Sequence, residues 1–143
     1  MLKRLLELKA PVNEILADMK IDSLLVAEWT RMAELIELLE PFSSQTNILQ
    51  TDALSLSYAI PSILDLECHL QSFQHSKVIA KAMLADMRSR FTNLLDPRSP
   101  DFIPHPVASC LLDPTVAPVL LTPDIASLLT AAKEFIIREV CVF

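Results

Sequence analysis

The chain has 143 residues, 52% of them hydrophobic, with ten prolines, no glycine and a formal net charge of −6. The lack of glycine disfavours tight hairpins and nucleotide-binding loops, and the negative charge is a poor match for nucleic-acid phosphates. Mean hydropathy is high, at +0.40, but charges interrupt every stretch of the ~20 residues that a membrane span needs. We therefore expect a single all-α domain over residues 1–143 with no membrane segment.

The first predicted helix covers residues 2–20. Pro11 lies inside it and predicts a kink or a restart, because proline lacks an amide hydrogen and clashes with the preceding turn. The apolar residues recur at three- and four-residue steps, as on one face of a helix. They are Leu2, Leu5, Leu6, Ile15, Leu16 and Met19.

Two central helices are predicted over residues 24–50 and 53–73, and the rest of the chain is expected to pack around them. Each contains one proline, Pro41 and Pro61, which predicts a bend. The face of the first helix that carries Trp29 is apolar, and glutamates fill the opposite face.

Polar residues before each central helix are the expected caps. Asp22 or Ser23 is placed to cap the first, and Thr51 with Asp52 the second.

The C-terminal half begins with a regular helix predicted over residues 77–95. A proline-rich linker over residues 96–106 and a short apolar segment over residues 107–112 follow it. A last helix is predicted after Thr122, with Pro123 at its favoured first position. The expected architecture is an irregular bundle of five or six helices, several bent at proline. The predicted structural core consists of Trp29, Met32, Ile36, Leu39, Phe42, Leu66, Leu70, Met83, Met87 and Phe91.

The central region resembles the helical region of hAT-type transposases, a family that includes many BED zinc-finger proteins. The family pattern is a Trp, a Leu-Leu-x-Pro-Phe block, a Thr and a Leu, and then a second helix with spaced Leu, Ser and Pro. The matching residues are Trp29, Leu38, Leu39, Pro41, Phe42, Thr46, Leu49, Leu54, Ser55, Pro61, Leu66 and Leu70. The resemblance extends over residues 1–114, but where the family has an Arg after its Leu-Asp-Pro motif, this chain has Thr115.

In that family the helical region is an insertion that interrupts an RNase H-like core with two catalytic aspartates and a glutamate. The resemblance implies that these acidic residues, and the BED finger that binds DNA, lie outside residues 1–143. It also implies an intracellular, nuclear protein that contacts DNA only through other parts of a larger parent.

Few residues suggest chemistry of their own. Asp65, Cys68 and His69 lie within about one turn, but a stable metal site needs three or four converging ligands. A solvated helix face or a local Asp65–His69 contact is the favoured interpretation. The chain's three cysteines are widely spaced and odd in number, as expected of reduced thiols, with Cys110 a buried small hydrophobe.

Four aspartates, Asp86, Asp96, Asp101 and Asp113, are of the residue type that a two-metal carboxylate site needs. Asp96 and Asp113 each precede a proline, which favours a role at helix ends and turns. Trp29 is of the type that stacks on a nucleic-acid base, but its acidic neighbours and its apolar stripe favour a place in the core. We therefore predict no catalytic residue, no metal ligand and no cofactor.

Three hypotheses follow. The first is a non-catalytic fragment of a hAT-transposase-like protein, acting as a structural or protein-interaction module. The second is part of an active DNA transposase whose acidic residues lie elsewhere, and the third is an unrelated helical adaptor. Under each, the apolar surplus predicts a protein partner or self-association, and no membrane partner.

Overall fold

The computed structural model describes residues 1–50 and 56–140, without the side chain of Val140. Within these ranges the chain forms eight α-helices, three short 3₁₀-helices and no strand, so the all-α class is confirmed. The α-helices are α1 Leu2–Glu7, α2 Lys9–Asp18, α3 Val26–Leu49, α4 Ala59–Ser72, α5 Lys77–Arg90, α6 Thr92–Leu95, α7 His105–Leu112 and α8 Ala126–Val140, and the 3₁₀-helices are η1 Leu56–Tyr58, η2 Ala117–Leu121 and η3 Pro123–Ile125.

The predicted count of five or six helices is too low because two predicted helices are split. The first breaks at Leu8, between α1 and α2. Pro11 explains this break, because it has no amide hydrogen to donate to the carbonyl of Glu7, where α1 ends. The helix predicted over residues 77–95 breaks at Phe91, between α5 and α6.

The central prolines behave differently from each other. α3 continues from Val26 to Leu49 with Pro41 inside it. Pro61 lies in the first turn of α4, where an amide hydrogen has no intrahelical partner, so α4 begins beside the proline and is not bent by it.

The expected caps are only partly tested. Neither Asp22 nor Ser23 caps α3, which begins after Leu25, whose amide donates to the Glu28 carboxylate at 2.7 Å. Thr51 and Asp52 lie outside the described residues.

Helices α3, α4 and α5 pack together around the first of two buried clusters. Its buried members are Leu38, Leu70, Ala80 and Met87. Six half-buried side chains surround them, and they are Phe42, Leu66, Phe73, Met83, Leu84 and Phe91. Most of the predicted core therefore meets here, on the two central helices and the helix that follows them.

The second buried cluster joins the start of α4 to α7, η2 and α8. Its members are Ile60, Val107, Cys110, Leu120, Leu128 and Ala132. Because Ile60 and Leu70 belong to different clusters, α4 is the element that the two clusters share.

The predicted core residues have unequal burial. Trp29, Leu70 and Met87 are buried, while Met32 and Ile36 are half-buried. The prediction for Leu39 is wrong, since it is 42% exposed and its neighbour Leu38 is fully buried. Successive helical residues lie about 100° apart, so a shift of one position turns a side chain away from α4.

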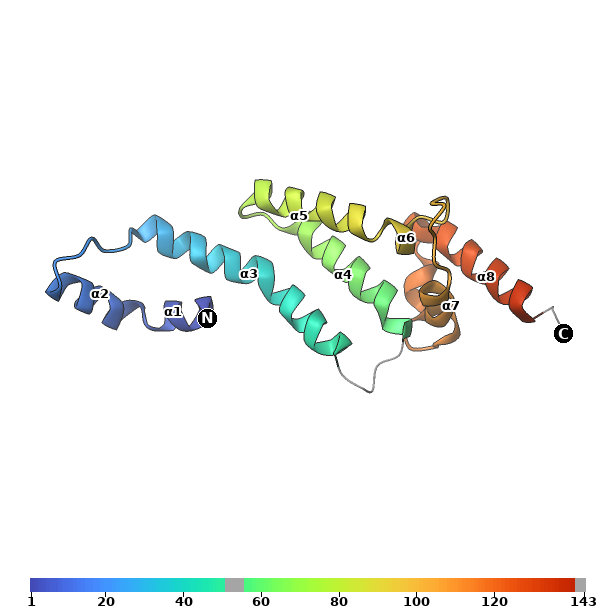
Figure 1. The fold of residues 1–143 in the computed structure, drawn as a ribbon, viewed down its shortest axis with the longest axis horizontal. Coiled ribbons are helices and arrows are strands. Elements are labelled where there is room, and N and C mark those ends of the chain that lie inside the picture. The colour runs from blue at the N-terminus through green and yellow to red at the C-terminus, as the bar shows by residue number, and fades with distance from the viewer. Residues whose placement is uncertain (51–55, 141–143) are drawn as a thin grey trace.

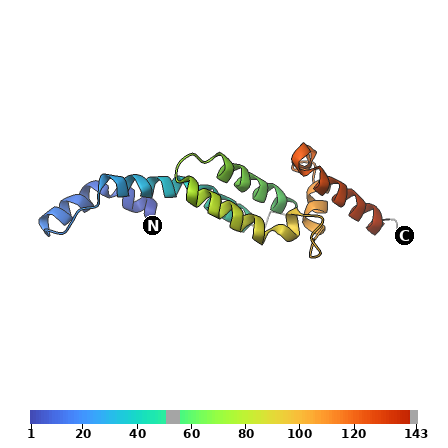
Figure 2. The ribbon, with the colours of Figure 1, turned by 90° about the horizontal axis from the view of Figure 1, so that it is seen from above.

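The molecule is elongated (Figures 1 and 2). Helices α1 and α2 lie beside the first half of α3 at one end, and α7 and α8 form the other end. The α2–α3 connection lies at the outer end of the N-terminal part, away from α4 and α5 (Figure 1).

Candidate functional site

The four aspartates of the candidate two-metal site lie on separate elements. Asp86, on α5, accepts a hydrogen bond from Arg90 Nε at 2.6 Å. Asp96, after α6, accepts one from the Arg98 amide at 2.9 Å, and Asp101 is exposed in the loop before α7. Within the described part of the chain, no group of three or more His, Cys, Asp and Glu side chains is placed to hold a metal ion.

Asp113 ends α7 and holds η1 against it. Its carboxylate accepts hydrogen bonds from Thr115 Oγ1 at 2.5 Å, Ser57 Oγ at 2.7 Å and the Thr115 amide at 3.0 Å. These bonds, the Thr115 hydroxyl first, lower the pKa of Asp113 below its ordinary value. The structure thus gives Asp113 the turn role expected for it.

The two cysteines that the structure describes differ in environment. Cys110 is fully buried, as predicted, and Cys68 is exposed on α4. Burial, and then the charge of Asp113, raise the pKa of Cys110 to about 11. Its thiolate is therefore scarce at neutral pH, which disfavours a nucleophilic role.

Two polar residues of α4, Asp65 and His69, contact α3. Asp65 accepts a hydrogen bond from Gln45 Nε2 at 2.8 Å. His69 Nε2 donates to the Leu38 carbonyl at 3.2 Å, and its ring packs against Phe73 with centroids 5.5 Å apart. Both side chains therefore connect two helices.

An open groove of about 570 Å³ lies beside α4, and Arg88 of α5 and residues of η2 and η3 also line it. The Glu67–Arg88 ion pair, with Nε and Oε1 2.8 Å apart, lies in its wall. Asp65 and Asp124 also line it, so its carboxylates outnumber its single arginine. This lining is unsuited to a phosphate group.

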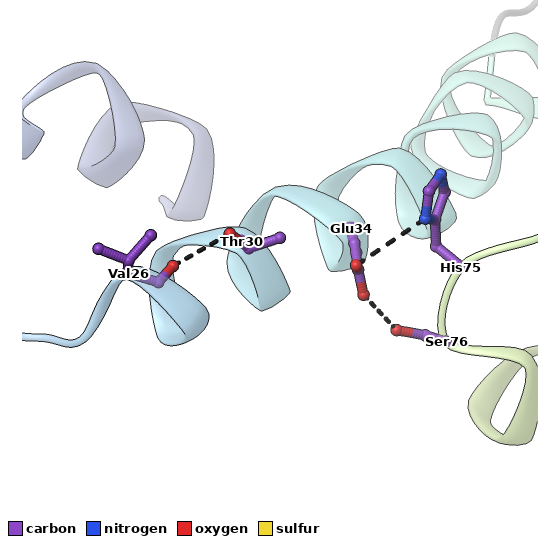
Figure 3. Close-up of polar contacts among 5 residues, drawn as sticks. All are labelled: Val26, Thr30, Glu34, His75 and Ser76. Carbon is purple, nitrogen blue, oxygen red and sulfur yellow. Dashed lines mark hydrogen bonds and ion pairs between the residues drawn. The ribbon is translucent and has the colours of Figure 1, made fainter.

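Glu34 fastens the start of α5 to α3 (Figure 3). Its carboxylate accepts a hydrogen bond from Ser76 Oγ at 2.8 Å and lies 3.9 Å from His75 Nδ1. Ser76 has a left-handed backbone with φ of 43° and directly precedes α5. Both contacts join the residues just before α5 to α3, so this group has a structural role.

Trp29 is the buried anchor between α3 and the N-terminal helices. It is 3% exposed, and Lys9 Nζ lies 5.6 Å from its ring centroid. The Lys3–Glu40 ion pair, 3.1 Å long, ties α1 to α3 as well. Burial leaves the Trp29 ring no free face for a nucleic-acid base.

Six large apolar side chains are exposed within a short stretch of the chain that we call the N-terminal tip and define as residues 15–26. Its six large apolar side chains are between 37% and 76% exposed, and α1 and α2 contain no buried residue. The six are Ile15, Met19, Ile21, Leu24, Leu25 and Val26. Sequence periodicity places Ile15 and Met19 on one apolar face of a helix, and the folded chain leaves both side chains more than half exposed.

Comparison with known proteins adds no relative. The chain matches no protein-family model, and no curated protein or solved structure matches it. None of the helices in the described ranges has the combined length and apolar character of a membrane span.

Proposed function

We propose that this chain is a non-catalytic helical module that acts by binding protein, of the kind that interrupts the RNase H-like core of hAT-type transposases. Under this proposal the chain belongs to a larger nuclear protein, and other parts of that parent carry the acidic catalytic residues and the DNA-binding finger.

The exposed tip is the observation that carries the proposal. Large apolar side chains gathered on one surface usually mark a protein contact, whereas scattered ones need no explanation. Leu25 and Val26, at the start of α3, are 68% and 76% exposed. An unrelated helical adaptor would use the same surface. The sequence that flanks residues 1–143 in the transcript would distinguish an adaptor from a transposase-like protein.

The positions that carry the family resemblance support the transposase-like origin. Leu38, Phe42, Leu66 and Leu70 belong to motifs on two different helices, and all four take part in one cluster between α3, α4 and α5. Residues of the family pattern that pack in one core are expected if the pattern reflects how these helices pack together.

The carboxylates support the non-catalytic part. Asp86 is paired with Arg90, and Asp113 accepts three hydrogen bonds from Ser57 and Thr115. Such contacts are typical of carboxylates that stabilise helices and turns, and they support a structural role for both residues.

DNA cleavage and binding assays test the proposal directly. With Mg²⁺ or Mn²⁺ and a donor DNA end, we expect the purified chain neither to nick nor to join strands. Salt-sensitive binding to duplex DNA tighter than about 1 μM would contradict it, as would cleavage abolished by Asp86→Ala, Asp96→Ala or Asp113→Ala.

A further inference from the structure

A second open groove, which we call the α4–α5 groove, lies between the end of α4 and the start of α5, two helices that run side by side (Figure 1). Its volume is about 400 Å³, which is within the range of small-molecule sites. Four apolar residues line it, of which Leu70 and Ala80 are buried and Phe73 and Leu84 are half-buried. Because all four also belong to the cluster between α3, α4 and α5, the packing of the helices holds this apolar floor in place.

The charged residues that line the α4–α5 groove are two lysines, Lys77 and Lys81, and two glutamines complete the lining. Both lysines are exposed, and neither forms an ion pair in the part of the chain that the structure describes. They lie four residues apart on α5, so their like charges repel each other. An anion held between the two ammonium groups would relieve that repulsion.

Four other grooves in the described part of the chain differ from this one in charge. Each contains at least one Asp or Glu in its lining. The arginines that line them, Arg88, Arg90 and Arg138, are each paired with a carboxylate. The α4–α5 groove therefore combines an apolar floor with unpaired positive charge, and it is suited to an anion that has an apolar part.

We propose that the α4–α5 groove binds a small amphipathic acid, such as a carboxylate with an alkyl tail. The two lysines hold the anionic head, and Leu70, Phe73 and Leu84 contact the tail. A phosphate of duplex DNA would leave the apolar floor exposed to water, so the floor selects the amphipathic acid. The site involves neither the tip nor a protein partner, and it adds a ligand to the proposed function without resting on it.

The test titrates the full chain with decanoate and follows the amide signals by nuclear magnetic resonance. We expect decanoate to shift the signals of residues 70–84, with a dissociation constant of about 1 mM or tighter. Hexanoate should bind at least about 10-fold more weakly, because its shorter tail buries less apolar surface. Decyltrimethylammonium, with a tail of the same length and the opposite charge, should leave these signals unshifted.

A matched pair of double variants tests the two lysines. Lys77→Gln with Lys81→Gln should weaken decanoate binding at least about 5-fold through the loss of both charges. Lys20→Gln with Lys133→Gln lowers the net charge equally at exposed positions outside the groove, and it should leave the dissociation constant unchanged. Circular dichroism checks that both double variants keep the helical content of the wild-type chain.

The site would be overturned if decanoate at about 5 mM left residues 70–84 unshifted, or shifted only residues 15–26. Equal shifts of residues 70–84 by decyltrimethylammonium, or equal weakening by the two double variants, would also overturn it. DNA cleavage would contradict the proposed function and leave this site standing.

Discussion

The two ends of this molecule use apolar side chains in opposite ways. At the C-terminal end, α7, η2 and α8 bury Val107, Leu120 and Leu128 almost completely. At the N-terminal end, α1 and α2 contain no buried residue, and their contact with α3 centres on Trp29. The C-terminal end therefore buries a cluster of apolar side chains, whereas the N-terminal helices pack mainly on one buried residue, Trp29.

Polar contacts follow the same division. Asp113 joins η1 to the end of α7 through hydrogen bonds with Ser57, which is itself buried. The ion pair that holds α1 to α3, Lys3–Glu40, is exposed on both sides and adds little stability. The N-terminal helices thus depend on Trp29 and its neighbours, and the C-terminal end depends on many buried groups.

Removing the single anchor of the N-terminal end should have the largest effect. We expect Trp29→Ala to lower the free energy of unfolding by about 3–5 kcal/mol, through lost burial and the cavity it leaves. Chemical denaturation followed by circular dichroism measures the change. A loss below about 1 kcal/mol would mean that α1 and α2 swing away from α3 in solution.

A substitution at the C-terminal end tests whether the two ends unfold together. Leu128→Ala should cost about 2–4 kcal/mol, and Leu121→Ala, at a 70% exposed position near it, less than about 0.5 kcal/mol. Because α4 carries residues of both clusters, we expect Leu128→Ala to shift the Trp29 fluorescence transition and the circular dichroism transition equally. A fluorescence transition left in place would show two independent units.

In the N-terminal and central parts, the sequence predicts which residues form helices better than it predicts which apolar side chains are buried. Apolar periodicity places Leu70 and Met87 in the core correctly, and the absence of glycine and strand patterns favours the all-α class that the structure confirms. The same periodicity places Ile15 and Met19 on an apolar helix face without indicating what covers it, and both are more than half exposed. Periodicity marks one face of a helix, but whether a neighbour covers that face depends on tertiary packing.

The C-terminal cluster is absent from the predicted core for a different reason, although Cys110 was predicted to be buried. Val107 and Cys110 lie on α7, an eight-residue helix after a proline-rich segment, which is too short to show a clear period. Ser57 and Asp113, 56 residues apart, are joined only by the packing of η1 on α7. A polar contact over that separation leaves no local pattern.

Acid should weaken the C-terminal end through Asp113. Since its folded pKa lies below the ordinary value of 3.8, its ionised form stabilises the fold above that value, and the contribution disappears as pH falls through the folded pKa. We expect Asp113→Asn to lower the melting temperature at pH 7 and the difference from wild type to shrink towards about pH 2. Asp101→Asn, at an exposed loop position, is the control. A difference that stays constant with pH would mean that the Asp113 charge makes no contribution.

The smallest expected effect concerns a polar group buried at the N-terminal end. Asn13 Oδ1, on α2, and Trp29 Nε1 are both buried without a hydrogen-bond partner. An unpaired buried acceptor costs free energy, so we expect Asn13→Leu to raise the free energy of unfolding by up to about 1 kcal/mol beyond the gain in helix propensity. Asn47→Leu, at an exposed position inside α3, measures that propensity gain alone. If Asn13→Leu instead destabilises the chain while Asn47→Leu does not, the Asn13 amide has a partner in solution. A small shift of α2 would bring the Trp29 indole N–H, also unpaired, within reach of Asn13 as its donor. In the Asn13→Leu background that hydrogen bond is already lost, so Trp29→Phe would cause no further loss from removing the donor.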